Sequence, residues 1–160
     1  MSLMPEITKE LENLIIEIDF DKFPRKYTCD GEDISPRVRF SRIRAKSLAL
    51  IMEARISPEK VFTHWLIWNI GPLPEIPEGI PREAMIRSPM SAVQGTNDFG
   101  KIGYNGPCPL QGKGQIYYFN VYGLDTLLDI PPGSGIKALR EAMHGHMVQY
   151  GGEAIATYQR

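Results

Sequence analysis

The spacing of apolar and polar residues predicts β-strands along most of the chain. In residues 14–20, Ile16 and Ile18 fall on one side of an extended chain and Glu17 and Asp19 on the other, which is typical of a strand with one buried face. Four later runs are rich in aliphatic or aromatic residues and are bounded by Gly, Pro, Asn or Asp. They span residues 38–40, 48–52, 64–70 and 116–124. The pattern therefore predicts a mainly β protein.

One helical period stands out late in the chain. Apolar residues recur three and four positions apart from Ile136 to Met147, and Ser134 stands where a helix cap is expected. We expect Gly151 and Gly152 to end this helix. Residues 153–158 are then expected to form a short terminal strand.

Two long irregular regions separate the predicted strands. Residues 71–89 contain five prolines, and residues 94–114 contain six glycines. Neither region has enough strands on each side for two separate cores, so we predict one domain over residues 1–160, with residues 1–13 poorly ordered. Long loops in a small domain often surround a binding site.

The charge balance argues against binding to nucleic acid or to an anionic membrane. The chain carries 18 Lys and Arg against 19 Asp and Glu, a formal net charge of -1, which gives no global field to attract nucleic acid or an anionic membrane. Charged residues at Glu6, Lys9, Glu10 and Glu12 interrupt the start of the chain, and no later apolar run is long enough to cross a bilayer. We therefore expect a cytoplasmic protein with neither a nucleic-acid partner nor a membrane span.

The two cysteines, Cys29 and Cys108, are too few for a disulfide-dense scaffold and form no Cys-x-x-Cys motif. In a reducing compartment we expect two free thiols, although the sequence leaves open whether the two residues meet. No phosphate loop, dinucleotide fingerprint or zinc spacing occurs in the chain, so we expect no cofactor and no metal.

Several short motifs in a fixed order resemble the phosphatidylethanolamine-binding protein family, in its short bacterial and archaeal form. The main matches are YTCDGEDISP at residues 27–36, FTHW at 62–65 with WNI at 68–70, and GYNGPCP at 103–109. Further matches are QGTND at 94–98, YYF at 117–119 and YGLD at 122–125. The resemblance covers roughly residues 18–160.

This resemblance implies an antiparallel β-sandwich with a C-terminal helix and a small anion pocket at one end. Family members bind phosphoryl groups, including phospholipid headgroups. Some act by docking on other proteins, as the mammalian Raf kinase inhibitor and plant flowering regulators do, and some inhibit serine proteases. The fold alone selects none of these functions.

The pocket residues implied by the resemblance are His64 on a strand, Gly106, Pro107 and Pro109 in a loop, and Tyr117 on a later strand. An imidazole that titrates near neutral pH suits an anion site, and a tyrosine hydroxyl can donate to a ligand oxygen. Each residue also has a structural reading: His64 and Tyr117 as core residues, and the loop as a rigid turn.

The chain departs from the family pattern at the pocket. Ala54, Arg55 and Ile56 stand where the family has Asp-Pro-Asp, and Gln115 and Ile116 replace its second histidine and its arginine. Arg55 is a candidate for a guanidinium at the pocket mouth that favours phosphate or carboxylate, with a solvated loop residue as the alternative.

Three hypotheses follow from these residues. The first is a binding protein with a degenerate phosphoryl or anion pocket, taking a small phosphorylated or carboxylate ligand. The second is an interaction protein with a vestigial pocket that acts on a kinase, a protease or a second copy of itself as a homodimer. The third and weakest is a hydrolase that uses His64, because no nucleophile-elbow motif surrounds any serine and Ser35, His64 and Asp30 form a triad only on paper.

Overall fold

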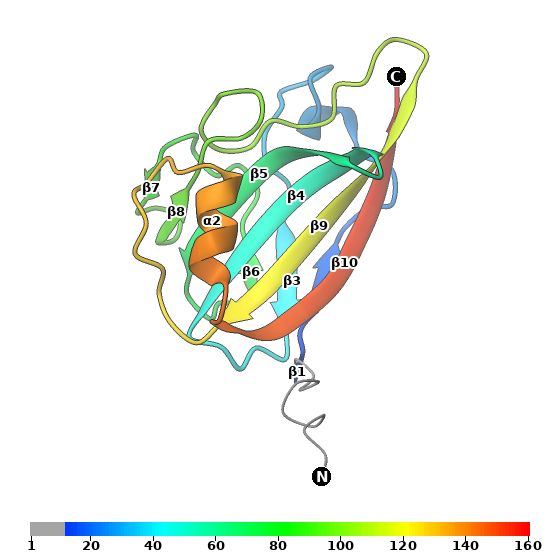
Figure 1. Cartoon of the computed structure of the whole chain (residues 1–160). Coiled ribbons are helices and arrows are strands. Elements are labelled where there is room, and N and C mark those ends of the chain that lie inside the picture. Colours follow the sequence, from blue (N-terminus) through cyan, green and yellow to red (C-terminus); the bar gives the residue numbers. More distant parts are fainter. Residues whose placement is uncertain (1–11) are drawn as a thin grey trace.

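Two sheets and one α-helix make up the computed structural model, which describes residues 12–160 (Figure 1). The larger sheet has seven strands in the order β1-β10-β9-β4-β5-β8-β7, and the smaller sheet has three in the order β2-β3-β6. Their bounds are β1 Glu12–Asn13, β2 Ile15–Ile18, β3 Val38–Ser41, β4 Ser47–Ser57, β5 Lys60–Ile70, β6 Glu75–Ile76, β7 Met85–Ile86, β8 Ala92–Gln94, β9 Gly114–Leu124 and β10 Met147–Gln159. The 3-10 helix η1 is Arg25–Tyr27, and α2 is Ile136–Met143.

The pairing within both sheets is antiparallel, apart from a short parallel pairing of β1 with β10 among the described strands. The predicted mainly β sandwich with a C-terminal helix is thus confirmed. Of the segment 1–13 expected to be poorly ordered, residues 1–11 lie outside the described residues, whereas Glu12–Asn13 form β1. No helix in the described part of the chain is both long and apolar enough to cross a membrane.

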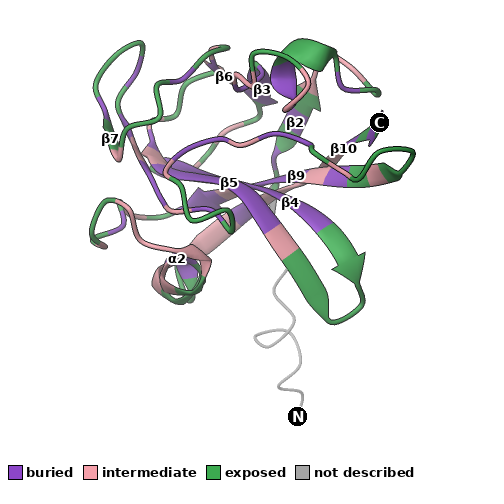
Figure 2. Cartoon of the chain, turned by 90° about the horizontal axis from the view of Figure 1, so that it is seen from above, coloured by how far each residue is buried: buried purple, intermediate pink, exposed green. Residues whose placement is uncertain are grey.

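The central strand β4 is apolar on both faces because two layers cover it. Leu48, Leu50 and Met52 pack into the core between the sheets. Ala49 and Ile51 belong to a second apolar cluster, between the larger sheet and α2. This explains the continuous apolar run, since a strand buried on both faces need not alternate. Beyond Ala54 the strand leaves this cover, and the tips of β4 and β5 are exposed (Figure 2).

The predicted helix is shorter than expected, and the terminal strand is longer. The helix α2 ends at Met143, the C-cap is His144, and the next residue, Gly145, has a left-handed φ of 83°. A glycine in this position is a common helix terminator. Ser134 also does not cap the helix, because its hydroxyl donates to the carbonyl of Pro131.

Gly151 and Gly152 lie inside strand β10 rather than at the end of a helix. The pairing of β10 with β9 shifts register between Tyr150 and Glu153, and Gly152 has a φ of 70°. A side chain at Gly151 would meet Val121 at 2.2 Å. The glycines therefore permit an irregularity in the sheet, as glycine often does in a strand.

The two cysteines form a disulfide, which corrects the expectation of free thiols. Cys29 and Cys108 are bonded across 79 positions of sequence, with their Cα atoms 5.4 Å apart. The loops that carry them are also joined by a hydrogen bond from the amide of Cys29 to the carbonyl of Pro107, at 3.1 Å. Sequence spacing alone carries no information on this approach.

Candidate functional site

An extra residue in strand β5 turns the side chain of His64 into a cavity at one end of the sandwich. Met52 pairs with Trp65 and Glu53 pairs with Thr63, so His64 has no partner of its own on β4. Such a bulge changes the direction of a side chain relative to regular alternation. As a result, Trp65 packs in the core between the sheets while the adjacent His64 lines the cavity.

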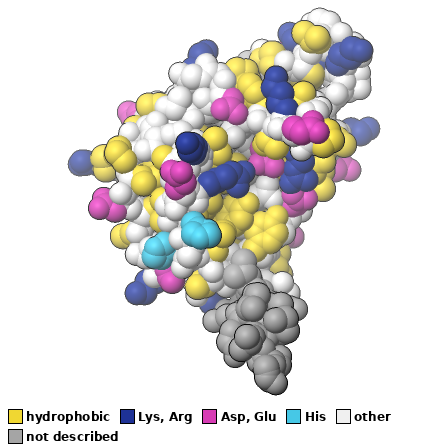
Figure 3. Space-filling view, in the orientation of Figure 1, with side chains coloured by type: hydrophobic (Ala, Val, Ile, Leu, Met, Phe, Trp, Pro, Cys, Tyr) yellow, Lys and Arg dark blue, Asp and Glu magenta, His cyan; other side chains and the backbone are white. Residues whose placement is uncertain are grey.

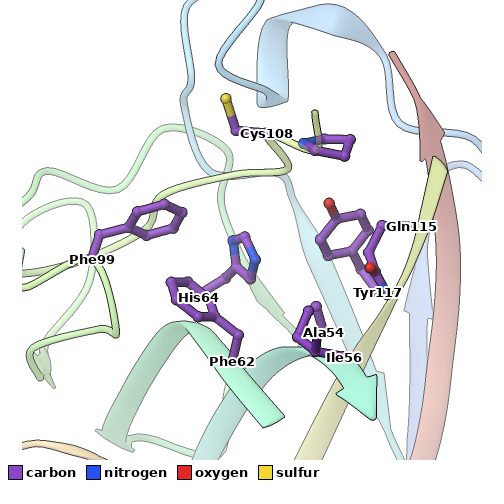
Figure 4. A pocket seen from close by; sticks show the side chains of 9 residues that line it. Ala54, Ile56, Phe62, His64, Phe99, Cys108, Gln115 and Tyr117 are labelled. Carbon is purple, nitrogen blue, oxygen red and sulfur yellow. The ribbon is translucent and has the colours of Figure 1, made fainter. Parts of the chain in front are cut away.

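The cavity has a volume of about 190 Å³ and is bounded by three strands and one long loop (Figure 4). Its lining residues are Ala54 and Ile56 from β4, Phe62 and His64 from β5, Gln115 and Tyr117 from β9, and Phe99, Cys108 and Pro109 from the loop between β8 and β9. Ala54 and Ile56 lie near the tip of a hairpin, in which β4 ends at Ser57 and β5 begins at Lys60.

The ring of His64 is held in one tautomer by the backbone. Its Nδ1 lies 2.7 Å from the carbonyl oxygen of Asn105, and a carbonyl oxygen can only accept. Nδ1 therefore carries a proton, and in the neutral ring Nε2 carries a lone pair. The amide of Asn105 donates in turn to the carbonyl of His64 at 3.2 Å, so Asn105 binds the histidine twice.

Aromatic rings enclose His64 on several sides. Phe62, Phe99 and Tyr117 each meet it edge to face, with ring centroids 5.2 Å, 5.3 Å and 5.2 Å away. The His64 side chain is only 4% exposed. This burial lowers the pKa of His64 below its usual value of 6.5, although the backbone carbonyl of Asn105 and the charge of Asp33 act in the opposite direction.

The loop that carries Phe99 and Asn105 is fixed by two polar side chains. Asn97 is buried and donates to Asn105 Oδ1 at 2.8 Å and to the carbonyl of Gly103 at 3.0 Å. Its own oxygen accepts from the amides of Phe99 and Lys101. Asp98 is tied to Thr63 on β5, since each residue accepts from the amide of the other.

The predicted loop residues Gly106 and Pro107 are not among the residues that line the cavity, although the backbone of Gly106 interacts with the His64 ring and acts to raise its pKa. The amide of Gly106 donates to Asp33 Oδ1 at 2.8 Å, and a Cβ atom at Gly106 would meet the carbonyl oxygen of Tyr27 at 2.0 Å. The backbone here is packed too closely for any side chain. These two residues therefore support the cavity wall, whereas Pro109 belongs to it.

Arg55 does not lie at the pocket mouth, which corrects that expectation. Side chains alternate along β4, so Ala54 and Ile56 line the cavity and Arg55 faces the side of the sheet that carries α2. There its guanidinium pairs with Glu53 and Glu153 and lies over the ring of Tyr118. On this face basic and acidic side chains are intermixed (Figure 3).

The three side chains of the hypothetical hydrolase triad are engaged separately. The hydroxyl of Ser35 accepts from the amide of Ile80, and Asp30 pairs with Tyr158 and Arg160, whereas His64 binds Asn105. Within residues 12–160, no group of three or more His, Cys, Asp or Glu side chains is arranged to hold a metal ion.

Phe62, Phe99 and Cys108 line the cavity but were not among the predicted site residues. Phe62 was open to prediction, because it stands two positions before His64 on the same strand. Phe99 was not, because it belongs to a loop with no periodicity. Its one sequence signal is an aromatic residue within a stretch of Gly, Asn and Asp.

Comparison with known proteins identifies relatives over nearly the whole chain. The family model for phosphatidylethanolamine-binding protein matches residues 18–159. A UPF0098 protein of Pyrococcus horikoshii is 49% identical over 140 residues, covering 86% of this chain and 70% of that protein. A UPF0098 protein of Methanothermobacter thermautotrophicus is 45% identical over 147 residues, covering 89% and 93%.

Two solved structures share the architecture. A putative phosphatidylethanolamine-binding protein homologue from Chlamydia trachomatis has a TM-score of 0.80 and 35% identity, covering 93% of this chain and 99% of its own. YbcL of Escherichia coli, described as a new member of the mammalian family, has a TM-score of 0.81 at 23% identity and covers 92% and 99%, which shows the shared fold. The match of the family model over residues 18–159, together with these relatives, shows that the chain belongs to the phosphatidylethanolamine-binding protein family.

Proposed function

We propose that this protein binds a small ligand with a phosphoryl or carboxylate group in the cavity beside His64, and that binding takes up a proton. The observation that supports this proposal is the hydrogen bond from His64 Nδ1 to the carbonyl of Asn105. It fixes which ring nitrogen changes when the histidine is protonated.

A neutral His64 is a poor partner for an anion. Its Nδ1 proton is used by Asn105, and the lone pair of Nε2 repels an anionic oxygen. Protonation converts Nε2 into a donor and adds a positive charge within a largely apolar cavity, where a charge-assisted hydrogen bond is stronger than in water. Because burial lowers the pKa of His64, the ring is mainly neutral at pH 7 before the ligand binds. Binding of the anion must therefore be accompanied by the uptake of a proton by His64.

Sulfate is the most direct probe of this coupling, because its charge is constant between about pH 5 and pH 8, the range in which histidine titrates. We expect sulfate to bind more tightly at the acidic end. Above the pKa of His64, affinity should fall by about tenfold per pH unit. Calorimetry at several pH values, with NMR shifts of the His64 ring, measures both effects.

The matched variant is His64→Asn, whose amide nitrogen occupies the place of Nδ1 and retains a donor to Asn105. This variant should bind sulfate weakly and without pH dependence in this range. Sulfate binding that is equally strong across the range, or that leaves the His64 resonances unmoved, would contradict the proposal.

A protein partner is a second candidate, favoured by the apolar rim of the cavity. Ile56 and Phe99 line the cavity and are exposed, and Leu110, which follows the lining residue Pro109 in the chain, is 76% exposed. Adjacent apolar side chains on a surface are typical of interaction sites. A kinase or a protease remains the class of partner that the family resemblance suggests.

A further inference from the structure

The cavity has one apolar wall that an inorganic anion would leave in contact with water. Ala54 and Ile56 from β4 form one part, and Phe62 and Phe99 form the other, with ring centroids 4.8 Å apart. The polar groups come from the strands on either side of β4: His64 from β5, and Gln115 and Tyr117 from β9. Figure 4 shows Ala54 and Ile56 together at the edge of the cavity, below the His64 ring and the Tyr117 ring.

No carboxylate is among the residues that line the cavity. The nearest acidic side chains are already engaged elsewhere. Asp33 accepts from the amide of Gly106, Asp98 accepts from the amide of Thr63, and Glu53 lies between Arg55 and Arg140 on the other face of the sheet. The charges of Asp33 and Asp98 act on the His64 ring, but neither carboxylate lines the cavity, so an ammonium group of a ligand would lose water there without a carboxylate in contact with it, which is costly.

We infer that the cavity selects anions that carry a short apolar substituent, and that it discriminates against headgroups of the ethanolamine type, which carry a primary ammonium. The inference rests on the proposed anion site at His64. It adds a second contact, between the substituent and the wall formed by Ala54, Ile56, Phe62 and Phe99. Ile56 is the residue that decides this preference, because it lies on the wall and is 51% exposed, at the opening through which the substituent extends.

Alkyl sulfonates test this inference, since their charge does not change with pH and their chain length can be varied alone. From methanesulfonate through ethanesulfonate to propanesulfonate, the dissociation constant should fall by about fourfold per methylene, the equivalent of about 0.8 kcal/mol. Taurine differs from propanesulfonate by an ammonium in place of a methyl group. It should bind more weakly than propanesulfonate and no better than methanesulfonate.

The variant Ile56→Asp places a carboxylate on the apolar wall at an exposed position. It should remove the gain with chain length and bring taurine above propanesulfonate in affinity. The control is Ile155→Asp, which has a similar exposure of 48% and lies on the other face of the sheet, paired with Tyr118. The control should reproduce the ligand order of the unmodified protein, and thermal unfolding of both variants checks that they are folded.

The outcomes separate this inference from the proposed function. If sulfate and all sulfonates fail to bind at about pH 5.5, where histidine protonation is favoured, the anion site itself is wrong and the inference is overturned with it. If the sulfonates bind with equal affinity, or if taurine binds most tightly to the unmodified protein, the anion site stands and the apolar selectivity is overturned. The same holds if Ile155→Asp alters the series as strongly as Ile56→Asp.

Discussion

His64 shows how one residue can serve both the core and a binding site. Its ring packs against Phe62, Phe99 and Tyr117 as a core aromatic residue would. Its backbone and its Nδ1 are both bound to Asn105. The ring is therefore held rigidly, and the protonation state of Nε2 is the one property of the side chain that a ligand can change.

The lowered pKa of His64 predicts how the stability of the protein depends on pH. In the unfolded chain the histidine takes up a proton near pH 6.5, whereas in the folded protein burial delays this uptake to lower pH. The contribution of the neutral ring to stability is thus complete above about pH 6.5 and is lost as the pH falls through the folded pKa. Urea unfolding measured between about pH 5 and pH 7 should show a steeper loss for the unmodified protein than for His64→Asn. Parallel curves would mean that the pKa is not lowered.

At the residue scale, alternation could predict part of the site and the bulge could not. Ala54 and Ile56 are two positions apart, so they must share a face that Arg55 does not. The adjacent residues His64 and Trp65 would face opposite sides of a regular strand, so alternation does not predict that they share a face. The extra residue in β5 arises from pairing with β4, which is a tertiary contact.

At the scale of the elements, the loop of residues 95–105 positions two residues that contact His64, namely Phe99 and Asn105. Its hydrogen bonds converge on Asn97, and it joins β5 through Asp98 and Asn105. Fixed loops of this kind position ligand-binding residues on a rigid sheet.

Replacing Asn97 should test whether this loop positions His64. Asn97→Ala removes two donors and an acceptor from a buried site, and leaving such groups unsatisfied costs about 1–3 kcal/mol of unfolding free energy. The Nδ1 proton of His64 should also exchange faster with water, as observed by NMR, because Asn105 loses its support. The variant Asn97→Asp keeps the acceptor for Phe99 and Lys101 but places a carboxylate oxygen against two acceptors, the carbonyl of Gly103 and Asn105 Oδ1, so it should lose at least as much stability as the alanine. A smaller loss in the aspartate variant would show that the donated hydrogen bonds contribute little.

For the strands and the helix, the sequence again predicts the regular parts but not where they end. The long strands β4, β5 and β9 follow from runs of aliphatic and aromatic residues, and the sequence located each of them. The helix predicted from the sequence is longer than α2, because the apolar spacing continues to Met147 and the glycine pair at 151–152 resembles a helix terminator. The helix in fact ends at Met143, and the glycine that follows it is Gly145. In the structure Met147 begins β10, so its apolar side chain belongs to a strand and not to the helical period.

For the molecule as a whole, the sandwich could be predicted but the contacts between its loops could not. The two apolar layers, one between the sheets and one beneath α2, reflect patterns that are visible in the sequence. The junction of residues 24–36 with residues 103–113 depends on particular approaches, such as Gly106 against Tyr27 and the Cys29–Cys108 bond. Contacts between residues so far apart in sequence leave no periodic signal.

The disulfide should contribute to the stability of the whole chain more than to the shape of the cavity. It closes a loop across 79 positions, and removing a crosslink of this kind typically costs about 2–4 kcal/mol, mainly because the unfolded chain regains freedom. The double variant Cys29→Ser with Cys108→Ser should therefore unfold at a lower urea concentration, and the reduced unmodified protein should unfold at about the same concentration as the variant.

The shape of the cavity should depend less on the disulfide, because hydrogen bonds also hold the loop that carries Cys108. They join the amide of residue 29 to the carbonyl of Pro107, the amide of Gly106 to Asp33, and the guanidinium of Arg160 to the carbonyl of Pro109. Sulfate affinity at acidic pH should therefore change little when the disulfide is removed. Unfolding at the same urea concentration with and without the bond would show that it adds nothing to stability, and a large loss of sulfate binding on reduction would show that the bond, and not these hydrogen bonds, holds the cavity wall in place.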